Sequence, residues 1–105
     1  MSLQATGLSA SVIQKISGVF ARHPAIKKVV LYGSRAKGGF RVGSDIDLTI
    51  TESAIDLSEL LLIENQIDDL MLPYKVDLSI FEKIENESLR DHICRVGQVF
   101  YLNLK

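Results

Sequence analysis

Three aspartate residues stand at spacings that could bring their carboxylates together. Asp45 and Asp47 are separated by one residue within segment 45–51, and Asp77 lies within segment 76–80. Both segments alternate polar and apolar residues, which is typical of half-buried strands. Side chains two positions apart share one face of a strand. Asp45 and Asp47 are therefore expected on one face, with Asp77 beside them if the two strands are neighbours.

Three ionised carboxylates on one sheet surface repel one another unless a positive charge lies among them. Mg²⁺ prefers carboxylate and phosphate oxygens and retains several waters, so it needs few protein ligands. The alternative is that alternating aspartates simply mark the solvated face of an antiparallel sheet. Because aspartate is depleted in strands, three such residues weigh against that alternative without excluding it.

A glycine-containing turn precedes the first two aspartates. The segment 33–38 (GSRAKG) directly follows an apolar segment, 28–32, that is expected to form a buried strand. Gly33 allows a ligand to approach the backbone closely. Ser34 offers a hydroxyl at the start of a helical turn, which favours anions. Arg35 and Lys37 add positive charge for a phosphate group. A plain turn remains the alternative, with Arg35 paired inside the fold, and the spacing does not match a Walker A loop.

Together these pieces form a more specific pattern: Gly33-Ser34, ten residues, Asp45-x-Asp47, and a separate Asp77 on a later strand. The pattern resembles the signature of the DNA polymerase β-like nucleotidyltransferase superfamily, and within it the minimal nucleotidyltransferases (MNT). The stretches that carry the likeness are LYGSRAKG (31–38), GSDIDLTI (43–50) and VDLSIFEKIENESLRDHICRVGQVFYL (76–102). The resemblance extends from the first expected helix to the end of the sequence.

The resemblance implies a Mg²⁺-dependent transfer of a nucleotidyl group from a nucleoside triphosphate, with ATP the expected donor, to an acceptor hydroxyl. It assigns Asp45, Asp47 and Asp77 as catalytic, metal-binding residues for two Mg²⁺ ions, with Asp77 beside the acceptor. It assigns Gly33 and Ser34 to the β- and γ-phosphates. Arg35 and Lys37 are expected to assist in binding the nucleotide.

The resemblance also implies a partner. Short MNT chains accompany helical HEPN-domain proteins, often ribonuclease toxins, and act as antitoxins, in some pairs by adenylylating a toxin tyrosine. We therefore expect a cytoplasmic protein adenylyltransferase and antitoxin that acts on a HEPN-domain toxin, with homo-oligomers possible. The alternative is a non-catalytic antitoxin that neutralises the toxin by docking. Neither membrane insertion nor direct nucleic-acid binding is expected.

The elements that must position these residues follow from periodicity and from capping and breaking residues. A helix capped by Ser9 or Ser11 should bury residues between 12 and 20 and end before Pro24. Strands are expected over 28–32, 45–51, 76–80 and 99–102. Asp56 should cap a helix that reaches Met71, with Met71 buried, and Asn86 should cap a helix over 86–96 with Gly97 as its C′ residue. The expected fold is α+β (α/β-like): a single nucleotidyltransferase domain over 1–105, with a small mixed sheet, helices on one face and an open catalytic face.

Composition fits such a domain. The 105 residues are 47% hydrophobic and 24% charged, which is ordinary for a globular protein. The net charge of −1 hides an asymmetry, because all 13 acidic residues follow residue 44. Such an asymmetry would suit the binding of a polyanion, which could contact the basic N-terminal segment and a cation held by carboxylates of the acidic segment. Cys94 is expected to be buried in a helix, and His23 and His92 to lie on helix surfaces without a role.

Overall fold

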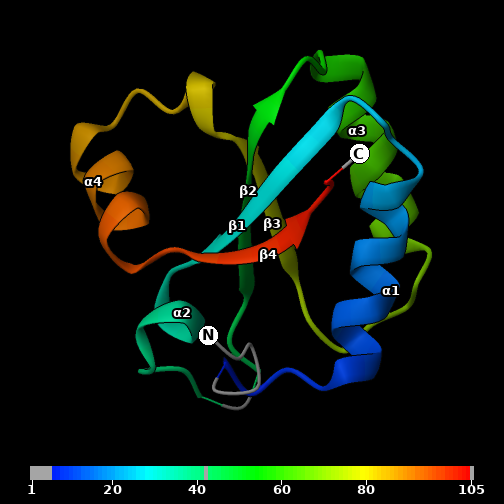
Figure 1. Cartoon of the computed structure of the whole chain (residues 1–105). Helices are drawn as coiled ribbons and strands as arrows, with labels where there is room; N and C mark the ends of the chain where they lie inside the picture. The colour runs from blue at the N-terminus through cyan, green and yellow to red at the C-terminus, as the bar shows by residue number, and fades with distance from the viewer. Residues whose placement is uncertain (1–5, 42, 105) are drawn as a thin grey trace.

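A four-stranded sheet carries the two aspartate segments side by side. The computed structural model describes residues 6–41 and 43–104. The strands β1 (Ile26–Tyr32), β2 (Ile46–Ser53), β3 (Val76–Ile80) and β4 (Gln98–Leu102) are arranged in the order β3-β2-β1-β4. Strand β1 is antiparallel to both β2 and β4, whereas β2 and β3 are parallel. The predicted α+β class with a small mixed sheet is therefore confirmed (Figure 1).

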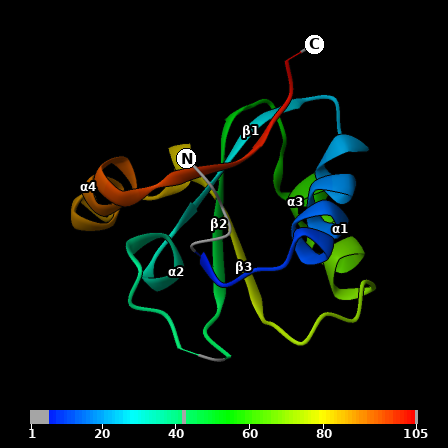
Figure 2. The same cartoon turned by 60° about the horizontal axis from the view of Figure 1, so that its bottom comes forward.

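Two helices cover one face of this sheet. Helix α1 (Ala10–Ala21) begins at Ser9, whose hydroxyl accepts a hydrogen bond from the amide of Val12. Helix α3 (Leu57–Asp68) is capped by Asp56, as predicted, and forms the parallel crossover between β2 and β3. Both helices lie on the same side of the sheet (Figures 1 and 2). Their buried side chains meet the inward-facing residues of the strands in one core; its largest fully buried members are Ile16, Phe20, Ile26, Leu31, Ile46, Leu48, Ile50 and Ile63.

The opposite face is open only in part. Helix α4 (Glu87–Val96), preceded by the 3₁₀ turn η2 (Phe81–Lys83), lies on the other side of the sheet from α1 and α3 (Figure 1). There Ile93 packs with Val30 and Tyr32, which alternate along β1 with residues of the main core. The expectation that all helices pack on one face is therefore corrected. The short helix α2 (Ser34–Lys37) follows β1 directly.

Three details of the helix ends differ from prediction. Helix α3 ends at Asp68, and Met71 adopts a φ of 54° that directs the chain away, so its side chain is 85% exposed rather than buried. Gly97 has φ −61° and ψ 141°, which is extended rather than a left-handed C′ conformation. Glycine is required there because a β-carbon would overlap with the carbonyl oxygen of Ile93 and with Val30. Cys94 is exposed, since it follows Ile93 and lies beside the narrow apolar stripe of α4.

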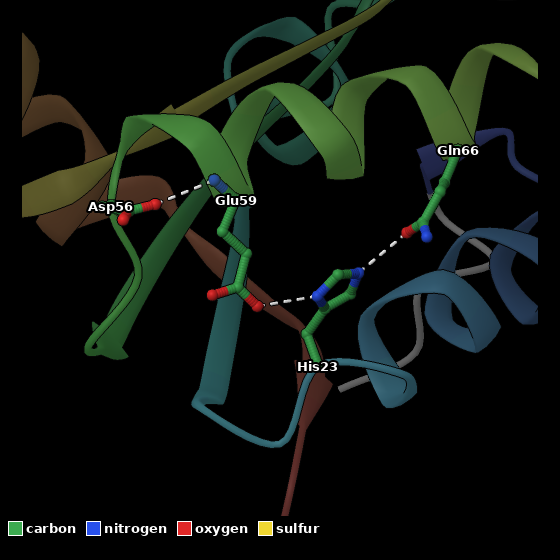
Figure 3. A network of polar contacts seen from close by, with 4 residues as sticks. All are labelled: His23, Asp56, Glu59 and Gln66. Atoms are coloured by element: carbon green, nitrogen blue, oxygen red, sulfur yellow. Dashed lines mark hydrogen bonds and ion pairs between the residues drawn. The ribbon is translucent and has the colours of Figure 1, made fainter.

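His23 also differs from prediction, because it is buried in a polar network that joins α1 to α3 (Figure 3). Its Nδ1 lies 2.7 Å from Oε2 of Glu59, and its Nε2 lies 2.8 Å from Oε1 of Gln66. Asp56 accepts a hydrogen bond from the amide of Glu59 and so fixes the same turn of α3. The network serves the fold on the face away from the aspartates. No helix in the described ranges is long and apolar enough to cross a membrane.

Candidate active site

Asp47 and Asp77 are directly paired across the parallel strands β2 and β3. Their apolar neighbours Ile46, Leu48 and Leu78 are buried in the main core, so both carboxylates leave the sheet on the opposite face. Asp47 is half-buried and Asp77 is exposed. Asp45 immediately precedes β2 and is also exposed. The strand register thus pairs Asp47 with Asp77, and Asp45 lies two residues before Asp47, just outside the strand.

The electrostatics of this face reveal mutual repulsion among the carboxylates. Partial burial raises the pKa of Asp47 above its ordinary value, and the negative charges of Asp77 and then Asp45 raise it further. A positive charge on His92, when that residue is protonated, would lower the pKa of Asp47. The folded chain therefore holds Asp47 where ionisation is disfavoured. Such an arrangement opposes stability, and a bound cation would relieve it.

The donor set fits a hard divalent cation that is shared with a substrate. Carboxylate oxygens from Asp45, Asp47 and Asp77 are the ligands that Mg²⁺ prefers. Within residues 6–41 and 43–104, no three acidic, histidine or cysteine side chains are arranged to hold a metal ion by themselves. Mg²⁺ in nucleotide sites commonly uses one or two carboxylates and completes its shell with waters and phosphate oxygens. The aspartates therefore suit a metal–nucleotide complex better than a permanent metal centre.

The turn after β1 approaches these carboxylates closely. Gly33 has φ 78° and ψ −158°, a conformation that side chains rarely adopt. A β-carbon at this position would overlap with the carboxylate oxygen Oδ2 of Asp47. Ser34 and Lys37, the first and last residues of α2, are exposed. The structure thus places Gly33 next to Asp47, and Ser34 and Lys37 follow it in α2.

Arg35 is different, because its side chain is turned into the fold. It is only 3% exposed, and its Nη1 donates to the carbonyl oxygen of Thr6 at 2.8 Å. Its Nε and Nη2 donate to the carbonyl oxygen of Ser44 at 3.1 and 3.0 Å. The guanidinium also lies over the rings of Phe40 and Tyr74. This geometry replaces the predicted phosphate contact of Arg35 with a structural role: it holds the loop end that leads into Asp45.

Two residues of the site were missed by the sequence analysis. His92, on α4, accepts a hydrogen bond at its Nε2 from the backbone N–H of Gly33, at 3.2 Å. Tyr32, the last residue of β1, packs edge-on against the imidazole. The pKa of Tyr32 is raised above its ordinary value, mainly by burial. A contact with Ser79 partly offsets this effect, and the negative charges of Asp47 and Asp77 add to it. No local pattern marked His92, because its role depends on α4 folding back over the open face.

A cavity of about 420 Å³ lies farther along the same face, between the sheet and α4. It is lined mainly by apolar side chains, including Val30, Phe81, Ile93 and Val99. The hydroxyl of Thr51 lies in this region and has no hydrogen-bond partner among the described residues. None of the predicted site residues lines the cavity. The predicted site is instead a surface arrangement at the turn after β1.

Comparison with known proteins links this arrangement to one family. The family model "Polymerase beta, Nucleotidyltransferase" matches residues 14–104. Among solved structures, a toxin–antitoxin crystal structure with AMP-PNP is 18% identical, with a TM-score of 0.69, covering 88% of this chain and 74% of the other. The toxin–antitoxin MntA–HepT is 15% identical with a TM-score of 0.67, covering 90% and 74%. No curated protein matches the sequence.

A provisionally assigned nucleotidyltransferase from Sulfolobus solfataricus is also similar, at 16% identity and a TM-score of 0.60, covering 97% of this chain and 87% of the other. At these identities the likeness concerns the fold. The family match, in contrast, spans the turn at Gly33 and all three aspartates.

Proposed function

The chain belongs to the polymerase beta nucleotidyltransferase family, and we propose that it transfers AMP from ATP to a hydroxyl group of a partner protein in a Mg²⁺-dependent reaction. The observation that carries the proposal is the pairing of Asp47 with Asp77 beside the close approach of Gly33 to Asp47. Carboxylates for cations and a glycine turn for phosphates thus meet at one place. A metal–triphosphate complex needs both.

In this proposal the aspartates and the turn have separate tasks. Asp45 and Asp47 hold the cations, and Asp77 shares one of them next to the acceptor. When bound, two divalent cations would stabilise the attacking oxygen and the leaving pyrophosphate. The backbone of Gly33, the hydroxyl of Ser34 and the ammonium of Lys37 hold the β- and γ-phosphates.

The reaction forms one bond and breaks one. The acceptor oxygen attacks the α-phosphorus, and the bond between that phosphorus and the bridging oxygen to the β-phosphate breaks, so pyrophosphate leaves. The hydroxyl proton passes to a carboxylate, and we assign this role to Asp77, which is exposed on the edge strand β3. The main contribution of the chain is to hold the donor in line for attack.

We further propose that the partner is a HEPN-domain toxin and that this chain is the cytoplasmic antitoxin of the pair. The support is the fold shared with MntA–HepT and with the toxin–antitoxin crystallised with AMP-PNP. A toxin hydroxyl, in particular that of a tyrosine, is the expected acceptor. Docking without catalysis is the second candidate function, and the following experiment separates the two.

The purified chain is incubated with Mg²⁺ and ATP labelled at the α-phosphate, with and without the protein encoded beside it. We expect label on the neighbouring protein, and loss of that label with Asp77→Asn. Toxin neutralisation is measured in parallel by growth of cells that express both proteins. Full neutralisation by an Asp45→Asn/Asp47→Asn double variant would establish docking as the function, and rapid transfer to free small alcohols would contradict a protein acceptor.

A further inference from the structure

His92 connects helix α4 to the turn that carries Gly33. Its Nε2 accepts a hydrogen bond from the backbone N–H of Gly33 at 3.2 Å, across 59 residues of sequence. Because a backbone N–H can only donate, Nε2 must be the unprotonated nitrogen of the ring. The edge-on contact with Tyr32, at 6.4 Å between ring centroids, adds a second restraint on the imidazole. The ring is therefore held from two sides.

The helix that carries His92 is itself fixed on the sheet. Ile93, the next residue, is buried with Val30 and Tyr32. Gly97 brings the end of α4 so close to Val30 that a β-carbon would not fit. At the other end, Arg90 donates to the carbonyl oxygens of Phe81 and Ile84 and lies over the Phe81 ring. The imidazole is thus presented to Gly33 by a rigid support.

The peptide bond before Gly33 needs such support. Gly33 occupies a region of φ and ψ, at 78° and −158°, that is nearly exclusive to glycine. The absence of a β-carbon also makes other backbone conformations accessible at this residue. In the described part of the chain, the hydrogen bond to His92 is what fixes the direction of the Gly33 N–H. That direction is toward the face on which Asp47 and Asp77 lie.

We propose that His92 is a positioning residue that holds the Gly33 N–H toward the open face, ready to donate to a phosphate oxygen of the nucleotide. The inference rests on the proposed function, since it concerns the same phosphate-binding turn. A phosphate oxygen is charged and accepts a stronger hydrogen bond than a neutral imidazole. An arriving phosphate oxygen can therefore share the N–H with Nε2 and accept the stronger hydrogen bond, without a rearrangement of the backbone.

The proposal predicts a specific effect on nucleotide affinity. Without the imidazole, the Gly33 peptide samples other directions, and binding must restore the correct one. Losing the hydrogen bond that orients the Gly33 N–H should weaken the binding of Mg²⁺–ATP by roughly 3–10-fold. Magnesium pyrophosphate should lose affinity by the same factor, because the effect acts on phosphate and not on the nucleoside.

Three variants test this. His92→Ala removes the acceptor, and His92→Gln places an amide oxygen near the position of Nε2. Arg95→Ala is the control, since it breaks only the exposed Asp91–Arg95 ion pair on the same helix. For each protein we would measure the Kd of Mg²⁺–ATP by calorimetry, the exchange rate of the Gly33 amide by NMR without nucleotide, and the melting temperature.

We expect faster Gly33 exchange and weaker binding in His92→Ala, recovery of both in His92→Gln, and wild-type behaviour in Arg95→Ala. Unchanged exchange and affinity in His92→Ala would overturn the proposal. The proposal would also be overturned if His92→Ala and His92→Gln lost affinity and amide protection equally, in proportion to their loss of melting temperature. His92 would then be a packing residue. The exchange rate of the Gly33 amide is measured without nucleotide, so it tests the role of His92 separately. If that rate rose in His92→Ala but the wild type bound no ATP, the result would contradict the proposed function and not the role of His92.

Discussion

Gly33 and Asp47 lie so close together that a β-carbon on residue 33 would occupy the space of the Asp47 carboxylate. The contact joins the turn after β1 to the strand that carries the aspartates. It also imposes two separate demands on residue 33: a positive φ and the absence of a side chain. The two demands can be separated experimentally because Gly38 has only the first.

Gly33→Ala should destabilise the protein more than Gly38→Ala and should abolish Mg²⁺–ATP binding. Gly38 has φ 100°, but a β-carbon there would meet no atom within 4 Å. Its alanine variant therefore reports backbone strain alone, expected at about 1 kcal/mol. At Gly33 the overlap with Asp47 adds to the strain, for a total of about 2–4 kcal/mol. Urea unfolding of both variants measures the difference, and equal losses would show that Asp47 moves aside without cost.

Asp47→Asn should stabilise the metal-free protein while abolishing nucleotidyl transfer. The carboxylate is half-buried and crowded by Asp77 and Asp45, so its charge opposes folding. The exposed Asp91→Asn, which removes a favourable ion pair with Arg95, should instead leave stability unchanged or slightly lower. Thermal melts in EDTA compare the two. A melting temperature well below wild type for Asp47→Asn would assign Asp47 a structural role.

The gain from Asp47→Asn should depend on pH in a defined direction. The pKa of Asp47 is raised in the folded state above its ordinary value of 3.8. The folded protein therefore binds this proton more tightly than the unfolded chain, and the stability of the wild type falls as pH rises through the folded pKa. The difference between variant and wild type should be smallest below about pH 4 and should grow above it. A constant difference from pH 3 to 8 would contradict the sign of the shift.

Arg35 and Lys37 should respond oppositely to substitution, although both lie in α2. Arg35→Ala removes three hydrogen bonds to the carbonyl oxygens of Thr6 and Ser44, and we expect a loss of about 2–4 kcal/mol in unfolding free energy. Lys37→Ala should leave the melting temperature unchanged because its side chain is exposed, and it should weaken Mg²⁺–ATP binding if Lys37 assists the nucleotide as proposed. Urea unfolding and calorimetry on both proteins give the comparison. A nucleotide defect in Arg35→Lys at unchanged stability would restore Arg35 as a phosphate ligand.

These residues show why part of the site could be predicted from sequence and part could not. The positions of Asp47 and Asp77 follow from period-two alternation, which assigns each side chain to a face once the strands exist. Arg35 could not be placed in the same way, because a four-residue helix has no periodicity and the carbonyls it bonds, of Thr6 and Ser44, lie 29 and nine residues away. His23 and His92 were misjudged for a related reason: their partners lie 36 and 59 residues away. Tertiary contacts decide such cases.

Removing divalent metal should weaken ATP binding far more than it affects the fold. Without a cation, the triphosphate would have to approach three carboxylates, and the charges of Asp77 and Asp45 already disfavour the ionisation of Asp47. The basic side chain of Lys37 alone cannot offset that repulsion. Calorimetric titration with ATP should therefore give a measurable Kd in Mg²⁺ and none in excess EDTA, while the melting temperature of the nucleotide-free protein is equal or higher in Mg²⁺. Equal affinity for ATP with and without EDTA would show that the aspartates do not form a metal–nucleotide site.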